Sequence, residues 1–234
     1  MAASSDSVAG HRPIRSFVLR SGRLTDAQAK AIQEYWQQYV VPFDGRQLDL
    51  NTLFDRPAPV VVEIGFGMGD SLLAMALANP QLNYLGIEVH KPGIGKLLLG
   101  ISNAGAGNLR MINHDAREVM EQGIPDGSLA GVQVFFPDPW HKKKHHKRRL
   151  IQPEFTALLA AKLQPGGRLH LATDWAPYAE HMLEVLGNCP ALVNCAADGG
   201  YSKDTPRPQT KFERRGLRLG HGVWDLVFRK TDAQ

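Results

Sequence analysis

The chain has 234 residues, of which 43% are hydrophobic and 21% charged, and its formal net charge is +4. This apolar content is enough to bury one full core, which predicts a single globular domain rather than a disordered chain. No stretch approaches the roughly 20 apolar residues that a membrane helix needs, and the opening MAASSDSVAGHRP lacks the apolar core of a signal peptide. We therefore expect a cytoplasmic protein with no membrane partner.

The basic residues are unevenly spread along the chain. Residues 11–30 hold five Lys or Arg against one acidic residue, residues 141–149 hold six against none, and residues 203–230 hold eight against three. The remainder of the chain is acidic. This segregation predicts a surface that binds a polyanion, and nucleic acid is the expected partner.

No metal site is expected from the sequence. The two cysteines, Cys189 and Cys195, match neither a redox pair nor a zinc motif, so we expect free thiols. The histidines between residues 141 and 146 have no acidic or thiol partner at ligand spacing, and the cations around them oppose metal binding.

The N-terminal part of the chain divides into an arm and a helix. Residues 1–24 are small, polar and basic, so we expect a flexible arm followed by one domain at residues 25–234. Residues 25–39 predict a helix with Thr25 as its N-cap. An apolar stripe at helical spacing predicts its packing surface; the stripe consists of Ile32, Tyr35, Trp36 and Tyr39.

From residue 60 onward, strands alternate with helices. We expect strands at 60–64, 84–89, 109–113, 131–136, 168–173, 192–196 and 223–229. We expect helices at 70–78, 91–103, 116–122, 150–163 and 176–186. Repeated βα units predict an α/β fold: a mostly parallel, doubly wound sheet of about seven strands with helices on both faces.

A glycine-rich turn follows the first expected strand. Gly65, Gly67 and Gly69 have the spacing GxGxG and open the next helix, at the edge of the sheet where open α/β folds bind ligands. A dinucleotide site would have GxGxxG, and Glu63 just before the turn would repel a phosphate. The pattern instead favours S-adenosylmethionine, which carries an ammonium, a sulfonium and a ribose but no phosphate.

Acidic residues also end the next two expected strands. Glu88 ends the second strand, where an acid can accept hydrogen bonds from both ribose hydroxyls, and Asp115 ends the third, where it can receive the adenine amino group. A GxGxG turn by itself is compatible with an ordinary tight turn. Three acids at three successive strand ends favour the cofactor site.

The fourth strand ends in FFPDPW, in which Asp138 lies between two prolines, and HKKKHHKRR follows at residues 141–149. The most basic segment therefore adjoins the edge of the sheet where the cofactor is expected. With VVEIGFGMGDSL, GIEV, the TDW of residues 173–175, and TKFERRG followed by HGVWDL, these motifs closely resemble those of the bacterial tRNA (guanine-N7-)-methyltransferases. The resemblance extends from about Arg15 to Phe228.

This resemblance implies a Rossmann-like class I methyltransferase that uses S-adenosylmethionine to methylate N7 of a variable-loop guanine in tRNA. Nothing in the sequence requires a protein partner. The implied cofactor contacts are Glu63, Gly65, Gly67, Glu88, Asp115 and Asp138, with Asp138 also the catalytic residue. The implied substrate or RNA contacts are Lys142, Lys144, His145, His146, Lys147, Arg148, Arg149, Asp174, Thr210, Lys211, Phe212 and Glu213.

One position departs from the family pattern. The family often has Arg where this chain has Lys144, which keeps the attraction for a phosphate but loses the bidentate geometry.

Guanine N7 carries an unprotonated lone pair, so its attack on a sulfonium methyl needs no general base. We expect positioning and electrostatics to dominate. Asp138 would orient guanine through its N1–H and amino group, or stabilise the positive charge that methylation leaves; a purely structural turn is the alternative. Asp174 either shares this role or caps the following helix.

Several interpretations stay open at this point. Trp140, Trp175 and Trp224 are candidates to stack on a base, with core packing as the alternative for each. Residues 201–220 form either a substrate-binding segment or an ordinary exposed loop. The competing functions are a non-catalytic RNA-binding module and a methyltransferase for a small molecule. Binding of labelled cofactor and methyl transfer to bulk tRNA would separate them.

Overall fold

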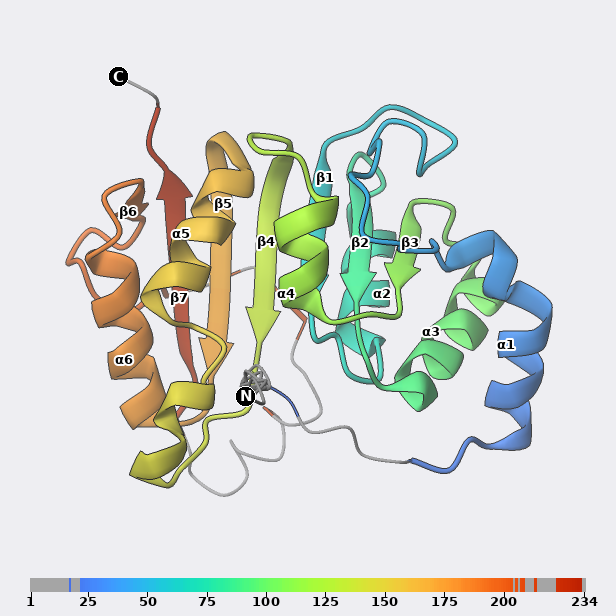
Figure 1. Ribbon diagram of the computed structural model, residues 1–234, viewed down its shortest axis with the longest axis horizontal. Helices are drawn as coiled ribbons and strands as arrows, with labels where there is room; N and C mark the ends of the chain where they lie inside the picture. Colours follow the sequence, from blue (N-terminus) through green and yellow to red (C-terminus); the bar gives the residue numbers. More distant parts are fainter. Residues whose placement is uncertain are drawn as a thin grey trace, which may run out of the picture.

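The computed structural model describes residues 17, 22–203, 205, 207, 208, 213 and 222–232. Seven strands form one sheet (Figure 1): β1 (Val60–Ile64), β2 (Asn83–Ile87), β3 (Leu109–Ile112), β4 (Leu129–Phe135), β5 (Leu163–Thr173), β6 (Leu192–Asn194) and β7 (Trp224–Lys230). The α-helices are α1 (Asp26–Tyr39), α2 (Asp70–Ala78), α3 (Lys91–Ala104), α4 (Ala116–Glu118), α5 (Pro153–Lys162) and α6 (Ala176–Gly187). A π-helical turn, η1 (Val119–Gly123), continues α4, and a 3-10 helix, η2 (Lys143–Arg148), follows β4.

The strand order is β3-β2-β1-β4-β5-β7-β6. Neighbouring strands from β3 to β5 pair in parallel, whereas β7 is antiparallel to both β5 and β6. In Figure 1 the arrows of β4 and β5 point one way and the arrow of β7 points the other. The prediction of a mostly parallel, seven-stranded α/β sheet is therefore confirmed.

Each face of the sheet carries its own apolar core. Alternate residues of the central strands, such as Val62, Val134 and Leu171, pack against η1, α5 and α6, which lie in front of the sheet in Figure 1. The other core includes Val61, Tyr84 and side chains of α1, α2 and α3. Since the carboxyl ends of the parallel strands lie together, the loops that follow them share one edge of the molecule.

The first helix forms as predicted. Thr25 is its N-cap: the hydroxyl accepts a hydrogen bond from the Gln28 amide at 3.3 Å, and the Gln28 side chain accepts one from the Thr25 amide at 2.9 Å. This reciprocal pair is a capping box. The predicted stripe packs, partly buried, against the core on the α1 to α3 side of the sheet, and consists of Ile32, Tyr35, Trp36 and Tyr39.

Several boundaries differ from the prediction for local reasons. The fourth strand stops at Phe135 because Phe136 has φ +52°, which is incompatible with a strand. The helix expected at 150–163 begins only at Pro153, at the start of a helix where proline is tolerated, and ends at Lys162. The third strand ends at Ile112, so Asp115 does not end a strand; it is the N-cap of α4.

Four further expectations concern the chain as a whole. Within the described ranges no helix is long and apolar enough to cross a membrane, and the residues placed there include no cluster of metal-ligating side chains. Cys189 and Cys195 are free thiols, as predicted. The expected flexible arm lies outside the described residues except for residues 17 and 22–24.

Candidate active site

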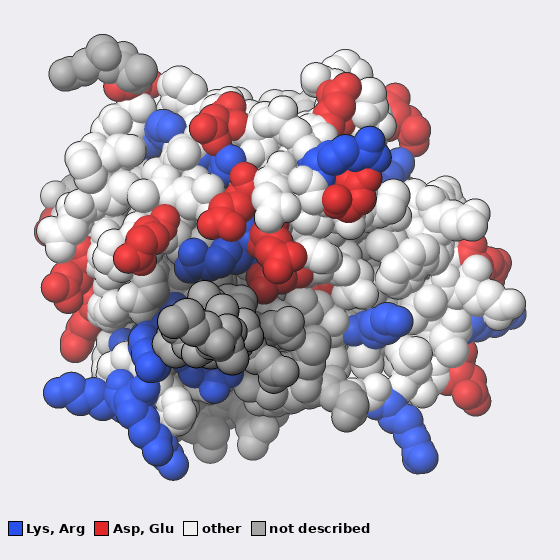
Figure 2. Space-filling view, viewed as in Figure 1, with Lys and Arg blue, Asp and Glu red and all other residues white. Residues whose placement is uncertain are grey.

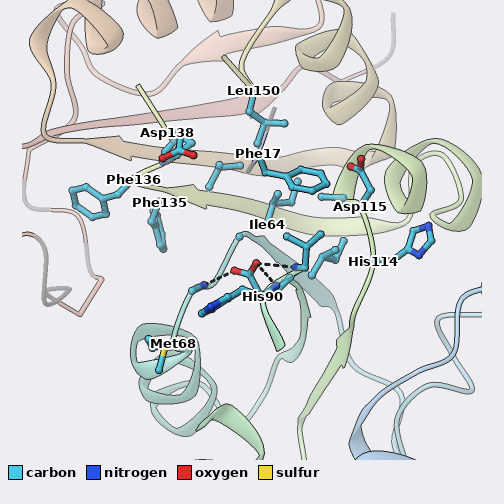
Figure 3. A pocket seen from close by; sticks show the side chains of 18 residues that line it. Phe17, Ile64, Met68, His90, His114, Asp115, Phe135, Phe136, Asp138 and Leu150 are labelled. Carbon is cyan, nitrogen blue, oxygen red and sulfur yellow. Dashed lines mark hydrogen bonds between the residues drawn. The ribbon is translucent and has the colours of Figure 1, made fainter. Parts of the chain in front are cut away.

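A cavity of about 420 Å³ opens at the carboxyl ends of β1, β2 and β4. The turn after β1, the segments after β2 and β3, and the end of β4 with the Phe136–Asp138 stretch that follows it all contribute to its wall (Figure 3). Phe17, from the N-terminal part of the chain, also points into it, and lies between Ile64 and Leu150 in Figure 3. The strand ends that the sequence singled out therefore meet around one hollow.

The glycine-rich turn forms one side of the cavity. Gly65 and Gly67 have φ +72° and +59°, and a Cβ added to either would meet no atom within 4 Å. These positions need glycine for the backbone conformation and leave open space above it. A Cβ on Gly93, at the start of α3, would lie 1.9 Å from the Gly67 carbonyl oxygen, so the turn and the helix are in direct backbone contact.

Glu88 follows β2 directly and holds this turn in place. Its carboxylate accepts hydrogen bonds from the backbone amides of Gly67, Val89 and His90 at 2.8, 2.8 and 3.0 Å, drawn as dashed lines in Figure 3. Because an ionised carboxylate can accept about four hydrogen bonds, acceptor sites remain after these three. The acid is therefore oriented by the protein itself, before any ligand is considered.

Glu63 is buried in β1, with 3% of its surface exposed, and is not among the cavity-lining residues. Its Oε2 has no hydrogen-bond partner among the described residues, and neither does Oε1 of Gln133, which lies beside Glu63 in the register of β1 and β4. Burial, with a smaller contribution from the charge of Glu88, raises the pKa of Glu63 to about 8. The site thus contains a buried acid that is costly to ionise in the absence of a cation.

Asp115 and Asp138 lie at opposite ends of one rim of the cavity in Figure 3. Asp115 accepts a hydrogen bond from the Arg117 amide at 2.9 Å as it caps α4. Asp138 is exposed.

The backbone around Asp138 is unusual. Phe136 and Trp140, two residues on either side of it, have φ +52° and +48°, a region that side chains other than glycine rarely adopt. Backbone strain of this kind clusters at functional sites and persists only where the surrounding structure imposes it. Together with Pro137 and Pro139, it fixes the direction in which Asp138 is presented.

The basic run after Asp138 folds into η2. Lys142, Lys143, Lys144 and Lys147 are exposed, and the guanidinium of Arg148 lies 3.8 Å from the centre of the Trp140 ring. His145 and His146 are partly buried; desolvation and the charges of the surrounding cations lower the pKa of His145. Figure 2 shows a group of Lys and Arg side chains at the lower left, on the side where the carboxyl ends of β4 and β5 lie in Figure 1, whereas acidic and basic side chains are mixed over the upper part.

Arg149 is the exception in this run. It was expected on the RNA-binding surface, but only 4% of it is exposed. Its Nε donates to the Pro139 carbonyl oxygen at 2.9 Å, and its guanidinium lies 4.7 Å from the centre of the Tyr178 ring. Arg149 therefore ties the end of η2 to the PDPW turn instead of facing solvent.

The end of β5 lies beside the end of β4, since the Phe136 amide donates to the Ala172 carbonyl oxygen at 2.8 Å. Asp174 follows β5 and is half-buried. The alternative that it caps the next helix is wrong, because the N-cap of α6 is Trp175 and no side chain caps that helix. Of the three candidate tryptophans, Trp175 alone is exposed, at 38%, and His141 packs against it edge-on at 4.3 Å.

Part of the third basic segment can also be placed. Thr210, Lys211 and Phe212 lie outside the described residues, whereas Glu213 is buried. The Glu213 carboxylate accepts two hydrogen bonds from Arg207, which also donates two to Asp225 of β7. Sequence reasoning missed both Arg207 and Asp225. The one available signal was a charged residue inside the apolar strand WDLVF.

Comparisons with known proteins identify the family of the chain. A family model described as "Putative methyltransferase" matches residues 57–226. A tRNA (guanine-N(7)-)-methyltransferase of Alkalilimnicola ehrlichii is 54% identical over 234 residues, covering 99% of both chains. One of Paraburkholderia xenovorans is 57% identical over 222 residues, covering 95% of this chain and 85% of that one. The chain belongs to the tRNA (guanine-N(7)-)-methyltransferase family.

Solved structures of more distant methyltransferases share the fold of this family member. The 16S rRNA methyltransferase KamB has a TM-score of 0.54 at 17% identity and covers 91% of this chain and 97% of its own. The antibiotic-resistance methyltransferase Kmr has a TM-score of 0.55 at 15% identity and covers 83% and 96%. The Rossmann-like class I methyltransferase fold predicted for the chain is confirmed.

Proposed function

We propose that this protein transfers a methyl group from S-adenosylmethionine to N7 of a guanine in the variable loop of tRNA. One observation carries the proposal: Asp138 lies on the rim of the cavity and is followed within five residues by an exposed basic helix. The proposed cofactor cavity and the proposed phosphate-binding surface therefore meet at Asp138. Since tRNA is a cytoplasmic molecule in bacteria, the reaction is expected in the cytoplasm.

The residues present fit the cofactor. The open space above Gly65 and Gly67 lets a ligand approach the backbone directly, whereas Glu63 is buried outside the cavity lining, so a cationic amino group would have to reach its unpartnered Oε2 past the turn. Glu88 is held with acceptor sites left for ribose hydroxyls. Asp115 is available at the far end of the rim for the adenine amino group.

The reaction requires no covalent bond between the protein and its substrate. When bound, S-adenosylmethionine would supply a methyl group bonded to a positively charged sulfur; the guanine N7 lone pair would form the new bond to the methyl carbon as the carbon–sulfur bond breaks, and the sulfur would leave as a neutral thioether. No proton is removed from N7, so Asp138 acts by accepting hydrogen bonds from the guanine N1–H and amino group, or by stabilising the positive charge left on the ring. Asp174, which follows the neighbouring strand β5, would share this task.

The basic helix accounts for the choice of a large polyanion. Lys142, Lys143, Lys144 and Lys147 are exposed on one short segment, an arrangement suited to phosphates of a folded RNA. A small-molecule methyltransferase would have no use for this surface. A non-catalytic RNA-binding module would have no use for the buried, unpartnered acid of Glu63.

The test is methyl transfer from labelled S-adenosylmethionine to unmodified tRNA, followed by mapping of the labelled nucleotide. We expect label at guanine N7. Label found only at another atom, such as N1 or N2, would contradict the proposal. Cofactor binding without any transfer to tRNA would instead favour the binding-module alternative.

A further inference from the structure

Arg207 is the centre of a buried polar cluster, here called the Arg207 cluster, which consists of Arg207, Glu213, Asp225 and His170. The Arg207 side chain is 3% exposed. It donates to Asp225 at 2.6 Å through Nε and at 2.8 Å through a terminal nitrogen, and to Glu213 at 2.5 and 3.1 Å. His170 of β5 lies 2.7 Å from the same Asp225 carboxylate.

The guanidinium geometry makes this cluster specific to arginine. One planar group donates in a forked fashion to two carboxylates at once, which a lysine ammonium cannot reproduce. Burial opposes the charge of Arg207, yet its hydrogen bonds to Asp225 and Glu213 raise its pKa above the usual range. Burial likewise opposes the charge of Asp225, but Arg207 and His170 lower its pKa to about 2. Both charges are therefore held over the whole physiological range.

The cluster lies against the wall of the active-site cavity. The guanidinium of Arg207 is 5.6 Å from the ring centre of Phe135 and 5.5 Å from that of Phe136, and both residues line the cavity two to three positions before Asp138. Asp225 pairs with Ala172 in the register of β5 and β7, and Ala172 accepts the hydrogen bond of the Phe136 amide. The carboxylate of Glu213 is thus connected to the end of β4 through Arg207 and anchored to the sheet through Asp225.

We propose that Arg207 is a positioning residue, which fixes the Glu213 carboxylate at the end of β4 where the guanine is presented for methylation. The role rests on the proposed function, because it acts on the orientation of the substrate through Glu213. Arg207 itself touches neither cofactor nor guanine. Asp225 and His170 hold the guanidinium in place, and the guanidinium in turn fixes the position in which the Glu213 carboxylate contacts the guanine.

The experiment is a double-mutant cycle on tRNA methylation at saturating cofactor, with Arg207→Lys, Glu213→Gln and the double variant. If Arg207 acts through Glu213, each single substitution lowers kcat/KM for tRNA by about 100-fold. The kcat/KM of the double variant then stays within about threefold of that of the less active single variant, because both substitutions remove the same contribution to catalysis. If the two residues contributed independently, the two losses would multiply, and kcat/KM of the double variant would fall by about 10⁴-fold.

A control separates positioning from folding. Arg110 is also a buried arginine: it is paired with Asp55 at 3.2 Å and packs over Tyr39 and Phe54, away from the cavity. Arg110→Lys should lower the thermal midpoint while leaving kcat/KM within about threefold of wild type. If Arg207→Lys does not fold, Asp225→Asn replaces it in the cycle, since it loosens the same guanidinium.

The outcomes distinguish this inference from the proposed function. Wild-type protein that leaves guanine N7 unmethylated contradicts the function. Wild-type activity at N7 with multiplicative losses in the cycle, or with Arg207→Lys no worse than Arg110→Lys, overturns the positioning role and leaves the function standing. Losses at N7 that do not multiply support both.

Discussion

The edge of the sheet that carries the site has two halves built in different ways. At the ends of β1, β2 and β3, the site is organised by backbone amides that donate to two acids: Glu88 accepts from the next two amides and from that of Gly67, and Asp115 accepts from the amide two residues on. At the ends of β4, β5 and β7, the organising contacts instead join charged side chains to one another. Arg207 reaches Asp225 across 18 positions, and Asp225 pairs with His170 across 55.

The difference follows from what each half binds. A small cofactor needs a few acceptors at fixed strand ends, and a short turn with a neighbouring acid can supply them. A guanine within a folded RNA has to be oriented against that cofactor from another direction, so the second half draws on segments from several parts of the chain. Substitutions should therefore affect cofactor affinity and tRNA turnover separately.

The largest expected effect is on the second half alone. Asp138→Ala should lower kcat for tRNA by about 10²- to 10³-fold, because it removes the acid that orients guanine on the cavity rim. S-adenosylmethionine binding, measured by calorimetry, should stay within about tenfold of wild type. Asp126→Ala is the control, since Asp126 is an exposed acid paired with Lys162 away from the site. Near-normal turnover of the Asp138 variant would remove Asp138 from the mechanism.

Glu63→Gln should affect the first half, with opposite signs for stability and binding. The folded pKa of Glu63 is raised from 4.5 to about 8, so ionisation destabilises the folded state as the pH rises through this range. Removing the charge should stabilise the ligand-free protein at pH 7 by about 3 kcal/mol and by under about 1 kcal/mol at pH 5. Urea unfolding at the two pH values measures the difference.

Cofactor binding by the same variant should weaken, since the partner proposed for the cationic amino group is gone. The ratio of wild-type to variant affinity should rise between pH 6 and 8, as Glu63 ionises more readily; titration of the ligand itself cancels in this ratio. Glu34→Gln, at an exposed acid of α1 outside the cavity wall, is the control. A pH-independent ratio would show that the cofactor does not contact Glu63.

A smaller effect is expected from the exposed lysines of η2. Lys143→Gln/Lys147→Gln should raise KM for tRNA by about tenfold and flatten the dependence of log affinity on log salt by about 0.7 to 0.9 for each phosphate that the protein no longer binds. Arg46→Gln/Arg168→Gln removes the same charge at exposed positions outside the three basic segments and should leave the slope unchanged. Equal slopes in the two double variants would mean that η2 does not bind phosphates.

The smallest effect should arise at the helix that packs behind the cofactor half. Thr25→Ala removes the capping box of α1 and should lower the free energy of unfolding by about 1 kcal/mol, without changing tRNA turnover. Thr52→Ala is the matched control, since Thr52 donates one exposed hydrogen bond to a nearby carbonyl. A loss of turnover in Thr25→Ala would mean that α1 contributes directly to the site.

The same division explains what could be predicted from the sequence. The bounds of β1 and α2 match the prediction residue for residue, because a continuous apolar run, a glycine turn and a helix follow one another directly. The end of β4 did not follow from apolar pattern, since Phe136 looks like a strand residue until its positive φ is known. Local patterns predict local structure, and this strain is imposed by surroundings.

Two basic residues make the same point for the site. Arg149 belongs to a run of basic residues that predicts one exposed surface. Its guanidinium instead donates to the Pro139 carbonyl oxygen and packs over the Tyr178 ring. Arg207 belongs to a segment rich in charged residues, yet its side chain is only 3% exposed. Whether a cation faces solvent depends on carboxylates, carbonyls and rings supplied by other elements, and sequence alone does not specify these partners.

The contact between Gly93 and the carbonyl oxygen of Gly67 limits how this site can change over evolutionary time. Any side chain at residue 93 would have to displace either the turn or the whole of α3, so neither segment can drift in position without the other. A single methyl group is enough to separate them. Relatives that vary at residue 93 should therefore carry a compensating change in the length or course of the glycine turn, and Gly93→Ala made alone should lower cofactor affinity although residue 93 need not touch the ligand.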